Sequence, residues 1–593
     1  MSVQGFKNIN NLKNLFVNPM GFISKGLLKI KTLVNEFRID GSTQAMITHN
    51  RKLWKGWANP KADNIVLVEM HHSLGTLTAD FYFTNVFARK KNARIVSFGR
   101  FRWNRKRALH ALYKSGNAAE HITAHELSAA QEKRCRELFS RIRPSLKTKQ
   151  DVFDLAFDGV NIGIDVFETY LREFNKPTLY FDAQFDSILE WAIGVYIYWS
   201  DYLQANKVVG IAVSHDCYID CNILNRLAYK MKIPVFIPWY FSIVRCSRPH
   251  TWSARFLAYK RWFDQMTDEV QKAAVIKAKA QIEKRFQGKF EGDIWYMKVS
   301  AYQQPVSDKR VLRESNKLKV LICTHCFFDS PQYYGGMLFH DFHDWLSFLA
   351  RIAQKTDYDW YLKTHPHPRP GTDEVIRSIL GENSPITVIP SATSPHQLVK
   401  EGVSHVLTVY GTVGHEYPAM GVQVVNAGYN PHIAFNFNWT PKNLKEYESW
   451  LMDLSSINKK IDLNEVYQFY FMYHYYSVVD DLIFPSAKAI LAKIGQAGMD
   501  TSTKVFSCIL QDWNKDQHQK VIDKIERYID ADKDFLYLKG PISLKENEFV
   551  KDALCNPSRM DFPIRRNDGP HQTSGDIGRR ARGEVEAFNG LSA

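Results

Sequence analysis

The sequence predicts an α/β protein with two doubly wound, Rossmann-like domains that face each other across a cleft. Its 593 residues are too many for one ordinary hydrophobic core. Short apolar runs alternate with helical stretches twice along the chain, first over 64–238 and again over 317–428. A charged, helical connector over about 250–310 separates the two series. Two successive domains are therefore the natural architecture.

The first series predicts buried strands at NIVLVEM (64–70) and ARIVSFG (93–99), with a polar turn and a helix between them. Helical stretches are expected to follow through about 143. The stretch at 207–238 then predicts a strand, a polar turn, a helix and a strand, which implies parallel pairing with a right-handed crossover. We assign this domain and the connector to residues 56–310.

The second series predicts five strands with helical segments between them, and we assign it to residues 311–500. The strands are KLKVLICTH (317–325), YDWYLKTHP (358–366), SPITVIP (384–390), SHVLTVYG (404–411) and GVQVVNAG (421–428).

Both ends of the chain fall outside the two series. Residues 1–55 are predicted to be an extension with an amphipathic helix, whose apolar stripe is formed by Ile23, Leu27, Ile30, Val34 and Phe37. Such a helix lies in a lipid interface or, equally, packs on its own protein. Residues 501–593 are predicted to hold a polar helix and then, from about 557, a disordered tail with few apolar residues.

The composition is that of a globular protein with a basic surface. Apolar residues make up 45% and charged residues 23%, and the formal net charge is +15. A positive surface favours anionic partners such as phosphorylated substrates or anionic lipid. The basic residues are scattered and no nucleic-acid-binding motif accompanies them, so nucleic acid is not an expected partner.

Cysteine usage and hydropathy indicate a cytoplasmic protein. Eight cysteines are sparse for this length, so no disulfide framework is expected. CTHC (323–326) has the spacing of a metal or redox motif, but no second pair follows it, and neither a metal nor another cofactor is expected. The sequence has no run of 18 apolar residues and no signal peptide.

Polar groups follow four strands of the second series at the point where each strand ends. In open α/β sheets, ligands bind beyond the carboxyl ends of the parallel strands, so these groups predict one binding site. The groups are His325 after the first strand, Lys363 and His365 after the second, Ser391 and Ser394 after the third, and the segment 411–416 after the fourth.

The segment GTVGHE (411–416) places Gly411, Thr412 and Gly414 where a strand gives way to a helix. Backbone N–H groups at such a helix start bind phosphate, and the glycines let the backbone approach it closely. Glu416 in the first turn can accept hydrogen bonds from ribose hydroxyls. The alternative is structural: Thr412 caps the helix, and Glu416 completes a favourable first turn.

The stretch LKTHPHPRPG (362–371) fixes His365 at a strand tip, because Pro366 cannot continue a strand ladder. An imidazole there can donate to a phosphate oxygen, and Lys363 adds positive charge. In a nucleotide-sugar reaction the departing nucleoside phosphate gains negative charge, and preorganised donors lower the barrier. We favour His365 as the catalytic donor, with Lys363 and His367 as weaker candidates.

Three stretches resemble the donor-binding half of bacterial capsule-polysaccharide biosynthesis proteins, a group that includes the capsule Kdo transferases. They are KVLICTHCFFDSP, YDWYLKTHPHP and SPHQLVKEGVSHVLTVYGTVGHEYPAMGVQVVNAG. The resemblance covers about 315–435, is weaker over 60–240 and leaves out both ends. It implies a GT-B fold, a CMP-activated or other nucleotide-activated sugar as the donor, and transfer without an essential metal.

The resemblance also implies roles for individual residues. His365 and Pro366 match a His-Pro motif that contacts the nucleotide phosphate. Residues 412–416 match a segment S/T-x-G-x-E that binds the nucleotide phosphate and the ribose. Val413 stands where the family typically has a second serine or threonine, which leaves the number of phosphate contacts open.

The first domain is expected to bind the acceptor and to supply a general base, usually a carboxylate or a histidine. Strand-end stretches offer Asp216, which we favour as the base, and Asp158. Each candidate can instead cap a helix or brace a turn. Histidines that can contact the acceptor are His71, His72 and His215.

The sequence thus predicts a glycosyltransferase that moves a sugar from a nucleotide donor, with a CMP-sugar favoured, to a lipid-linked or growing surface polysaccharide. The basic surface and the N-terminal helix would hold it on the inner face of the bacterial cytoplasmic membrane. Three alternatives stay open: a CDP-polyol phosphotransferase of the teichoic-acid type, a UDP-sugar 2-epimerase, and a non-catalytic assembly partner.

Overall fold

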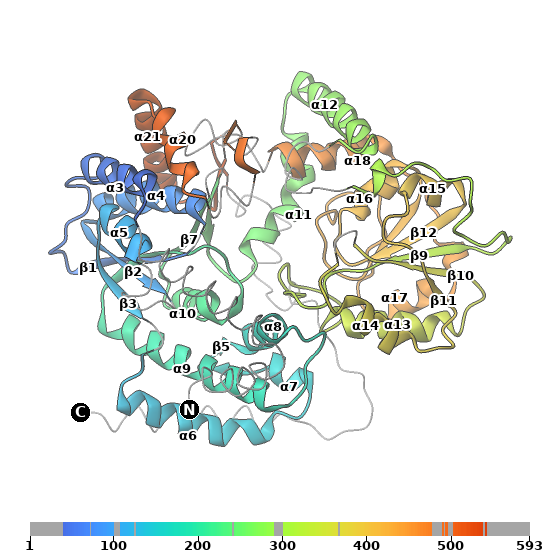
Figure 1. Ribbon diagram of the computed structural model, residues 1–593, viewed down its shortest axis with the longest axis horizontal. Helices are drawn as coiled ribbons and strands as arrows, with labels where there is room; N and C mark the ends of the chain where they lie inside the picture. Colours follow the sequence, from blue (N-terminus) through green and yellow to red (C-terminus); the bar gives the residue numbers. More distant parts are fainter. Residues whose placement is uncertain are drawn as a thin grey trace, which may run out of the picture.

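The computed structural model has two α/β domains side by side, joined by helices at one end (Figure 1). Among the described residues, no helix is long and apolar enough to span a bilayer. The predicted apolar stripe at 23–37 and the tail from 557 lie outside the described residues, as do His72, Pro366 and His367. The structure describes residues 39–71, 73–99, 107–123, 126–239, 242–289, 300–365, 368–476, 489–490, 493–495, 502–537 and 540–542.

The first domain is built on an eight-stranded sheet with the strand order β15-β14-β8-β7-β6-β1-β2-β3. The run from β7 to β3 is parallel, and β8, β14 and β15 extend it through antiparallel pairs. The strands are β1 (Asn64–Glu69), β2 (Ala93–Gly99), β3 (Ala118–Thr123), β6 (Val208–Ala212), β7 (Val235–Trp239), β8 (Ser242–Cys246), β14 (Phe535–Tyr537) and β15 (Gly540–Ile542).

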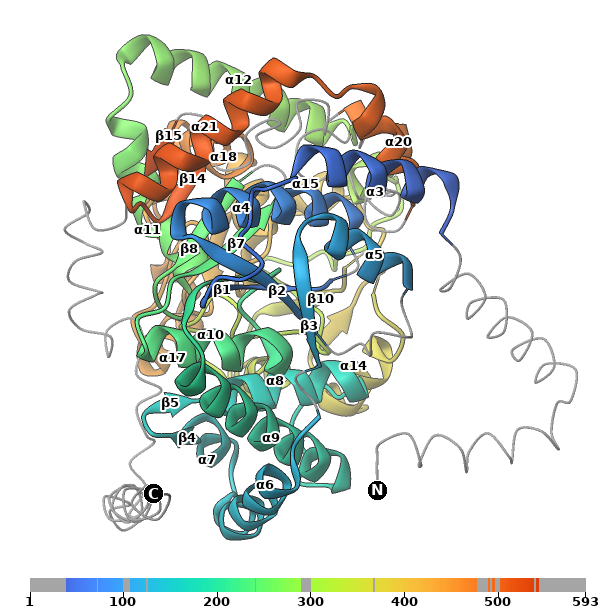
Figure 2. The ribbon, with the colours of Figure 1, turned by 90° about the vertical axis from the view of Figure 1, so that its left-hand side faces the viewer.

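Helices cover both faces of this sheet, because successive strand residues point to opposite sides. Ile65 and Leu67 of β1 lie in one hydrophobic core, whereas Val66 and Val68 lie in the other. Figure 2 shows the two groups of helices on either side of β1 and β2. The Val66 side is covered by α3 (Gly41–Leu53), α4 (Leu74–Lys91), α5 (Arg107–Ser115), α20 (Lys504–Gln511) and α21 (Lys515–Ala531). The Ile65 side is covered by α6 (Ala129–Ile142), α7 (Lys149–Phe153), α8 (Gly163–Phe174), α9 (Ala183–Ala205) and α10 (Ile223–Lys230).

The second domain is a five-stranded parallel sheet with the order β11-β10-β9-β12-β13. Val320 and Ile322 of β9 face one core, and Leu321 and Cys323 face the other. The strands are β9 (Lys319–Cys323), β10 (Asp359–Lys363), β11 (Ile386–Val388), β12 (Val403–Thr408) and β13 (Gln423–Asn426). The helices are α13 (Phe342–Ala353), α14 (Thr372–Leu380), α15 (Pro395–Lys400), α16 (Val413–Ala419) and α17 (Leu444–Met452).

The parallel strands of the two domains have the same order. Within each series the first strand, β1 or β9, lies between the second strand and the fourth. This is the doubly wound arrangement, in which ligands bind at the carboxyl edge where the order reverses. The predicted fold class of two Rossmann-like domains that face each other is therefore confirmed.

Helices lie at the junction between the two domains (Figure 1). They are α11 (Thr251–Asp264), α12 (Asp268–Phe286) and α18 (Leu463–Phe471). Helix α18 follows the second domain and packs against α12, α16 and α11. The chain thus leaves the first domain through α11 and α12 and comes back toward it along α18.

Two segments belong to the first domain although the sequence predicted them outside it. Helix α3, within the expected extension, buries Met46 and Ile47 in the core on the Val66 side. Helix α21 packs on α4, and Phe535 of β14 pairs with Val244 of β8. These contacts join residues far apart in sequence, which local patterns do not reveal.

One strand lies where the sequence predicted only helices. Strand β3, AAEHIT, forms the edge of the first sheet beside β2. Only its first residue is fully buried. An edge strand with this exposure needs few apolar residues, which is why the apolar pattern did not predict it.

Candidate functional site

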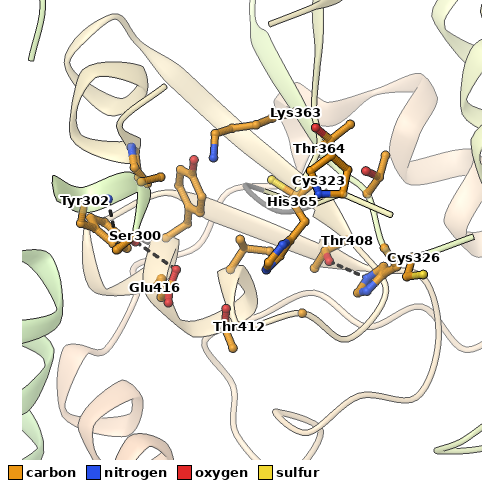
Figure 3. A pocket seen from close by; sticks show the side chains of 18 of the residues that line it. Ser300, Tyr302, Cys323, Cys326, Lys363, Thr364, His365, Thr408, Thr412 and Glu416 are labelled. Atoms are coloured by element: carbon orange, nitrogen blue, oxygen red, sulfur yellow. Dashed lines mark hydrogen bonds between the residues drawn. The ribbon is translucent and has the colours of Figure 1, made fainter. Parts of the chain in front are cut away.

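A cavity of about 360 Å³ lies at the carboxyl ends of β9, β10 and β12 in the second domain. Its walls come from the loop after each strand and from the connector (Figure 3). The residues that the sequence selected after three different strands therefore surround one space. The lining residues include 323–326 at the end of β9, 363–365 at the end of β10 and 411–413 after β12. Arg285 and Tyr302 of the connector also line the cavity.

Lys363 is a buried cation that lines this cavity. It is 8% exposed, and within the described part of the chain its ammonium group has no hydrogen-bond or ion-pair partner. Burial lowers its pKa, while the charges of Cys323 and Glu416 oppose that shift. Burying an unpaired ammonium is costly, so the fold holds this group ready for an anion from solution.

His325 is held as a neutral imidazole at the floor of the cavity. Burial, and then the charge of His365, lower its pKa to about 3. The N–H of Val409 donates to its Nε2 at 3.2 Å, and the Thr408 hydroxyl lies 3.1 Å from the same atom. Because Nε2 accepts a hydrogen bond, the ring proton lies on Nδ1. His325 therefore acts as a neutral polar group and not as a cation.

The corner after β12 differs from the phosphate loop that the sequence predicts. The N–H groups of Gly414 and His415 already bond to carbonyls of Gly411 and Thr412. A Cβ on Gly414 would lie 2.3 Å from the His432 ring, so close packing requires this glycine. The Thr412 side chain makes no capping bond, although Thr412 is the N-cap of α16. Its hydroxyl thus stays available to the cavity.

Glu416 joins the second domain to the connector. Arg285 Nε donates to its Oε1 at 3.0 Å, and the Tyr302 hydroxyl donates to its Oε2 at 3.0 Å. Both side chains of the ion pair are 8% exposed. Burial, together with the Glu416 charge, raises the pKa of Tyr302 well above its ordinary value. Glu416 is therefore fixed by protein groups, and it lines the cavity.

The other donor-side candidates lie at or near the rim. His365 is exposed and lines the cavity (Figure 3). The neighbouring Pro366 lies outside the described residues. Ser394 is buried before α15, and its hydroxyl has no hydrogen-bond partner within the described ranges. Pro395 lines the cavity, whereas Ser391 and Ser394 are not among the described lining residues.

In the first domain, two of the candidate histidines bond to neighbouring polar side chains. His71 is buried, and its Nε2 lies 2.7 Å from Asp80 Oδ2, to which the Tyr113 hydroxyl also donates. The Ser214 hydroxyl donates to Glu69 at 2.7 Å and lies 2.5 Å from His215 Nδ1. His71 therefore belongs to a buried polar cluster, whereas His215 is half-buried at its edge.

Neither carboxylate proposed as the base faces the cavity. Asp216 is 7% exposed, and neither of its oxygens bonds to another described residue. Burial raises its pKa to about 6. Asp158, with φ 48°, and Gly159, with φ 76°, form the turn between the short strands β4 (Ala156–Phe157) and β5 (Val160–Asn161). Asp158 thus sits at a hairpin tip, where it accepts a bond from Tyr196.

Among the residues that the structure describes, two groups of side chains have ligand atoms close enough to hold a metal ion, within 4.8 Å of one another. The first is Glu69, His215 and Cys221, and the second is Asp341, His343 and Asp344. In both groups the carboxylates already bond to protein donors. The Ser214 hydroxyl donates to Glu69, and the Lys149 ammonium pairs with Asp341 and Asp344.

Sequence patterns missed four cavity residues with charged or phenolic side chains, one of which is Tyr417 in α16. Arg285 and Tyr302 lie in the connector, and no local signal links them to the strand ends. Arg369 lies in the same proline-rich loop as His365, and its positive charge was a signal that could have selected it. With Arg285 and Lys363, it makes three cations against one carboxylate among the described lining residues.

Comparisons with known proteins found remote structural likenesses. No family model and no curated protein matches the chain. Similar solved structures include a KpsC β-Kdo 2,4-transferase from Thermosulfurimonas dismutans, with 14% identity and a TM-score of 0.28 over 44% of this chain and 79% of that one. A UDP-GlcNAc 2-epimerase from Neisseria meningitidis has 12% identity and a TM-score of 0.19 over 72% and 98%. A Rickettsia africae glycosyltransferase has 10% identity and a TM-score of 0.22 over 76% and 99%.

These likenesses are remote and concern the fold alone. The two facing doubly wound domains, with β1 and β9 at equivalent positions, place the chain in the GT-B class of α/β folds. What the chain binds follows from its own cavity.

Proposed function

We propose that the chain is a glycosyltransferase that takes a sugar from a nucleotide-activated donor bound in the second-domain cavity. The observation that carries this proposal is Lys363, a buried ammonium without a protein partner in the described structure, which lines a cavity where cations outnumber carboxylates. Such a site selects an anion. A nucleoside phosphate supplies one, and its base and sugar occupy the remaining volume of about 360 Å³.

The chemistry follows from where charge develops. As the bond between the sugar and the phosphate breaks, the departing phosphate gains negative charge. Lys363 and His365 come from the tip of the same strand, and Thr412 lies across the cavity from them (Figure 3). Cationic and hydroxyl donors already in place stabilise this charge more in the transition state than in the ground state.

The resemblance to capsule-polysaccharide proteins favours a CMP-sugar as the donor and a lipid-linked or growing surface polysaccharide as the acceptor. Cationic side chains supply the charge that a metal ion would otherwise supply, so we propose transfer without a metal. The acceptor enters from the first domain, whose strand ends face the junction.

Calorimetric titration with CMP, CDP and UDP tests this proposal. We expect CMP to bind with the highest affinity and its binding to survive EDTA. Preference for CDP with turnover of CDP-glycerol would instead indicate a polyol-phosphate transferase, and preference for UDP with epimerisation of UDP-GlcNAc a 2-epimerase. Failure of all three nucleotides to bind would leave only a non-catalytic role.

We also propose that the protein works on an anionic membrane surface, because its net charge is +15 and its N-terminal stretch has an amphipathic pattern. Removal of residues 1–38 is the appropriate test, since a deletion to 50 would remove most of α3 from the core. We expect the full chain to float with phosphatidylglycerol vesicles and the shortened chain to stay in solution. Equal flotation of both would show that these residues do not bind membranes.

A further inference from the structure

Glu69, Ser214 and His215 form a hydrogen-bonded relay at the carboxyl edge of the first sheet. Glu69 ends β1, and Ser214 and His215 follow β6, the strand beside it. The backbone N–H and the hydroxyl of Ser214 both donate to Glu69 Oε2 at 2.7 Å. Ser214 Oγ lies 2.5 Å from His215 Nδ1.

The direction of these hydrogen bonds determines which ring nitrogen of His215 carries the proton. The Ser214 hydroxyl has one hydrogen and gives it to Glu69, so toward His215 it can only accept. The His215 proton therefore lies on Nδ1, and Nε2 carries a lone pair. No described residue hydrogen-bonds to this Nε2, and His215 is half-buried. A base oriented by a second group and a carboxylate is the arrangement that activates hydroxyl nucleophiles.

The groups around the relay set the protonation states of His215 and Glu69, which form its two ends. Burial lowers the pKa of His215, and so do the charges of His71 and Arg172, while Glu69 opposes them. Burial would raise the pKa of Glu69, but His215, His71 and the two Ser214 bonds outweigh it and hold it below its ordinary value. His215 is thus neutral near pH 7 and Glu69 is ionised.

The relay lies beside the junction of the two domains. The Tyr218 ring packs edge-on to the His215 ring, with centroids 6.1 Å apart. The Tyr218 hydroxyl and Arg172 both bond to Asp329 of the second domain, at 2.8 and 2.7 Å. Asp329 belongs to the loop after β9, which also carries the cavity residue Cys326. The loop after β9 therefore contacts Tyr218 beside the relay and also lines the donor cavity.

Asp216, the neighbouring residue, is buried. It lies among Tyr229 and Cys246, whose pKa values are raised by burial and by its charge. Asp216 is buried, whereas His215 is half-buried and is oriented by Ser214 and Glu69.

We propose that His215 is the general base of the transfer, with Ser214 and Glu69 as its positioning residues; this inference rests on the proposed function. Nε2 removes the proton from the acceptor hydroxyl as the acceptor oxygen bonds to the anomeric carbon. The bond from that carbon to the nucleotide phosphate breaks, and the nucleoside phosphate leaves with the electron pair. Lys363 and His365 stabilise its negative charge. The proton on Nε2 then passes to solvent.

The test compares full-length wild type with His215→Asn. CMP affinity is measured by calorimetry, and donor turnover by nucleotide release from CMP-Kdo, or from UDP-GlcNAc if UDP is the nucleotide that binds. We expect CMP affinity within about twofold of wild type and turnover at least about 100-fold lower, the usual scale for a lost general base. His49→Asn is the matched control, because it removes a half-buried imidazole of the same domain in α3.

Glu69→Gln and Ser214→Ala test the relay through the pH profile of kcat/KM. The Glu69 carboxylate stabilises the charged form of His215, so removing its charge moves the acidic limb to lower pH. A merely structural role lowers the rate without moving the limb. Zinc retained by wild type and lost from Glu69→Gln and Cys221→Ser would show that the cluster holds a metal, and would overturn the base assignment.

The outcomes separate the two proposals. Nucleotide binding with wild-type turnover in His215→Asn overturns the base assignment and leaves the transferase standing. A chain that binds none of the nucleotides and turns over no donor overturns both. Normal binding, slow turnover in His215→Asn and a shifted limb in Glu69→Gln support both.

Discussion

The two sheets of this protein have the same parallel strand order, yet their carboxyl edges differ in how polar groups are used. In the first domain, His71 bonds to Asp80, and Glu69 bonds to Ser214. In the second domain, Lys363 lines an open cavity and has no protein partner in the described structure.

This difference shows that a carboxyl edge can bind a ligand where its polar groups are without protein partners. The doubly wound order places polar residues at the edge in both domains. Groups that bond to one another stabilise the fold, whereas groups without protein partners around a cavity are available to a ligand. His215 stands between these cases, because one ring nitrogen is held by the protein and the other is not.

The largest expected effect comes from Glu416, the donor-side acid that already has protein partners. Glu416→Ala leaves the buried guanidinium of Arg285 unpaired. We expect a loss of about 3–5 kcal/mol in the free energy of unfolding, measured with urea. The double variant Arg285→Met with Glu416→Leu should recover most of it. A loss below about 1 kcal/mol in the single variant would show that the pair does not join the connector to this edge.

The next largest effect is expected for Asp216→Asn, which should change how the free energy of unfolding depends on pH. Its pKa is about 6 in the folded chain, against an ordinary value of 3.8, because of burial. Between these values the folded chain keeps a proton that the unfolded chain has lost, so its stability falls as pH rises through this window. We expect Asp216→Asn to be more stable than wild type by about 3 kcal/mol at pH 7.5, and equal to it at pH 3.5.

The Asp216→Asn variant also tests which residue at the carboxyl edge of the first sheet is the general base. Donor turnover in Asp216→Asn should stay near the wild-type rate, because Asp216 faces the protein interior. A 100-fold loss of turnover with unchanged nucleotide affinity would move the base from His215 to Asp216.

A smaller effect is expected for Lys363→Met, which keeps the length of the side chain. Loss of one charge-assisted contact of about 1.5–3 kcal/mol should weaken nucleotide binding by about 10- to 150-fold. The melting temperature of the free protein should stay the same or rise, because an unpaired buried charge is removed. Lys400→Met, at an exposed lysine in α15, is the control and should change neither quantity. A lower melting temperature with intact binding would mean that Lys363 serves the fold.

The smallest effect is expected for His365→Ala, because His365 is exposed at the rim. Turnover should fall at least about tenfold, the lower scale for a lost transition-state donor, while the fold survives. His365→Gln keeps a hydrogen-bond donor and should recover part of the rate. Wild-type turnover in the alanine variant would remove His365 from the mechanism.

Local patterns predicted much of the fold and part of the site. Apolar runs marked β1, β2, β6, β7 and the strands of the second domain, because strands buried on both faces are apolar throughout. The strand-end rule selected His325, Lys363 and Thr412, which line one cavity. The remaining contacts lie outside the reach of a local rule. For example, Arg285 lies in the connector and donates to Glu416, which is far from it in the sequence.

The structure adds to the sequence prediction for both candidate carboxylates of the first domain. The Asp-Gly pair at 158–159 is the commonest signal for a tight hairpin turn, and the structure has that turn between β4 and β5. The sequence interpretation treated Asp158 as a strand-end base instead. It selected Asp216 together with His215 at a strand end, and the fold buries this carboxylate and leaves His215 half-buried.

The return of residues 535–537 to the edge of β8 has a consequence for biosynthesis. A ribosome makes β8 long before β14, with the whole second domain in between. Until β14 emerges, β8 carries a row of unpaired backbone groups that invites association with other chains. The strands of the second domain are contiguous in the chain, so that domain can finish folding first. Nascent chains that stop before residue 535 should therefore be the ones that require chaperones.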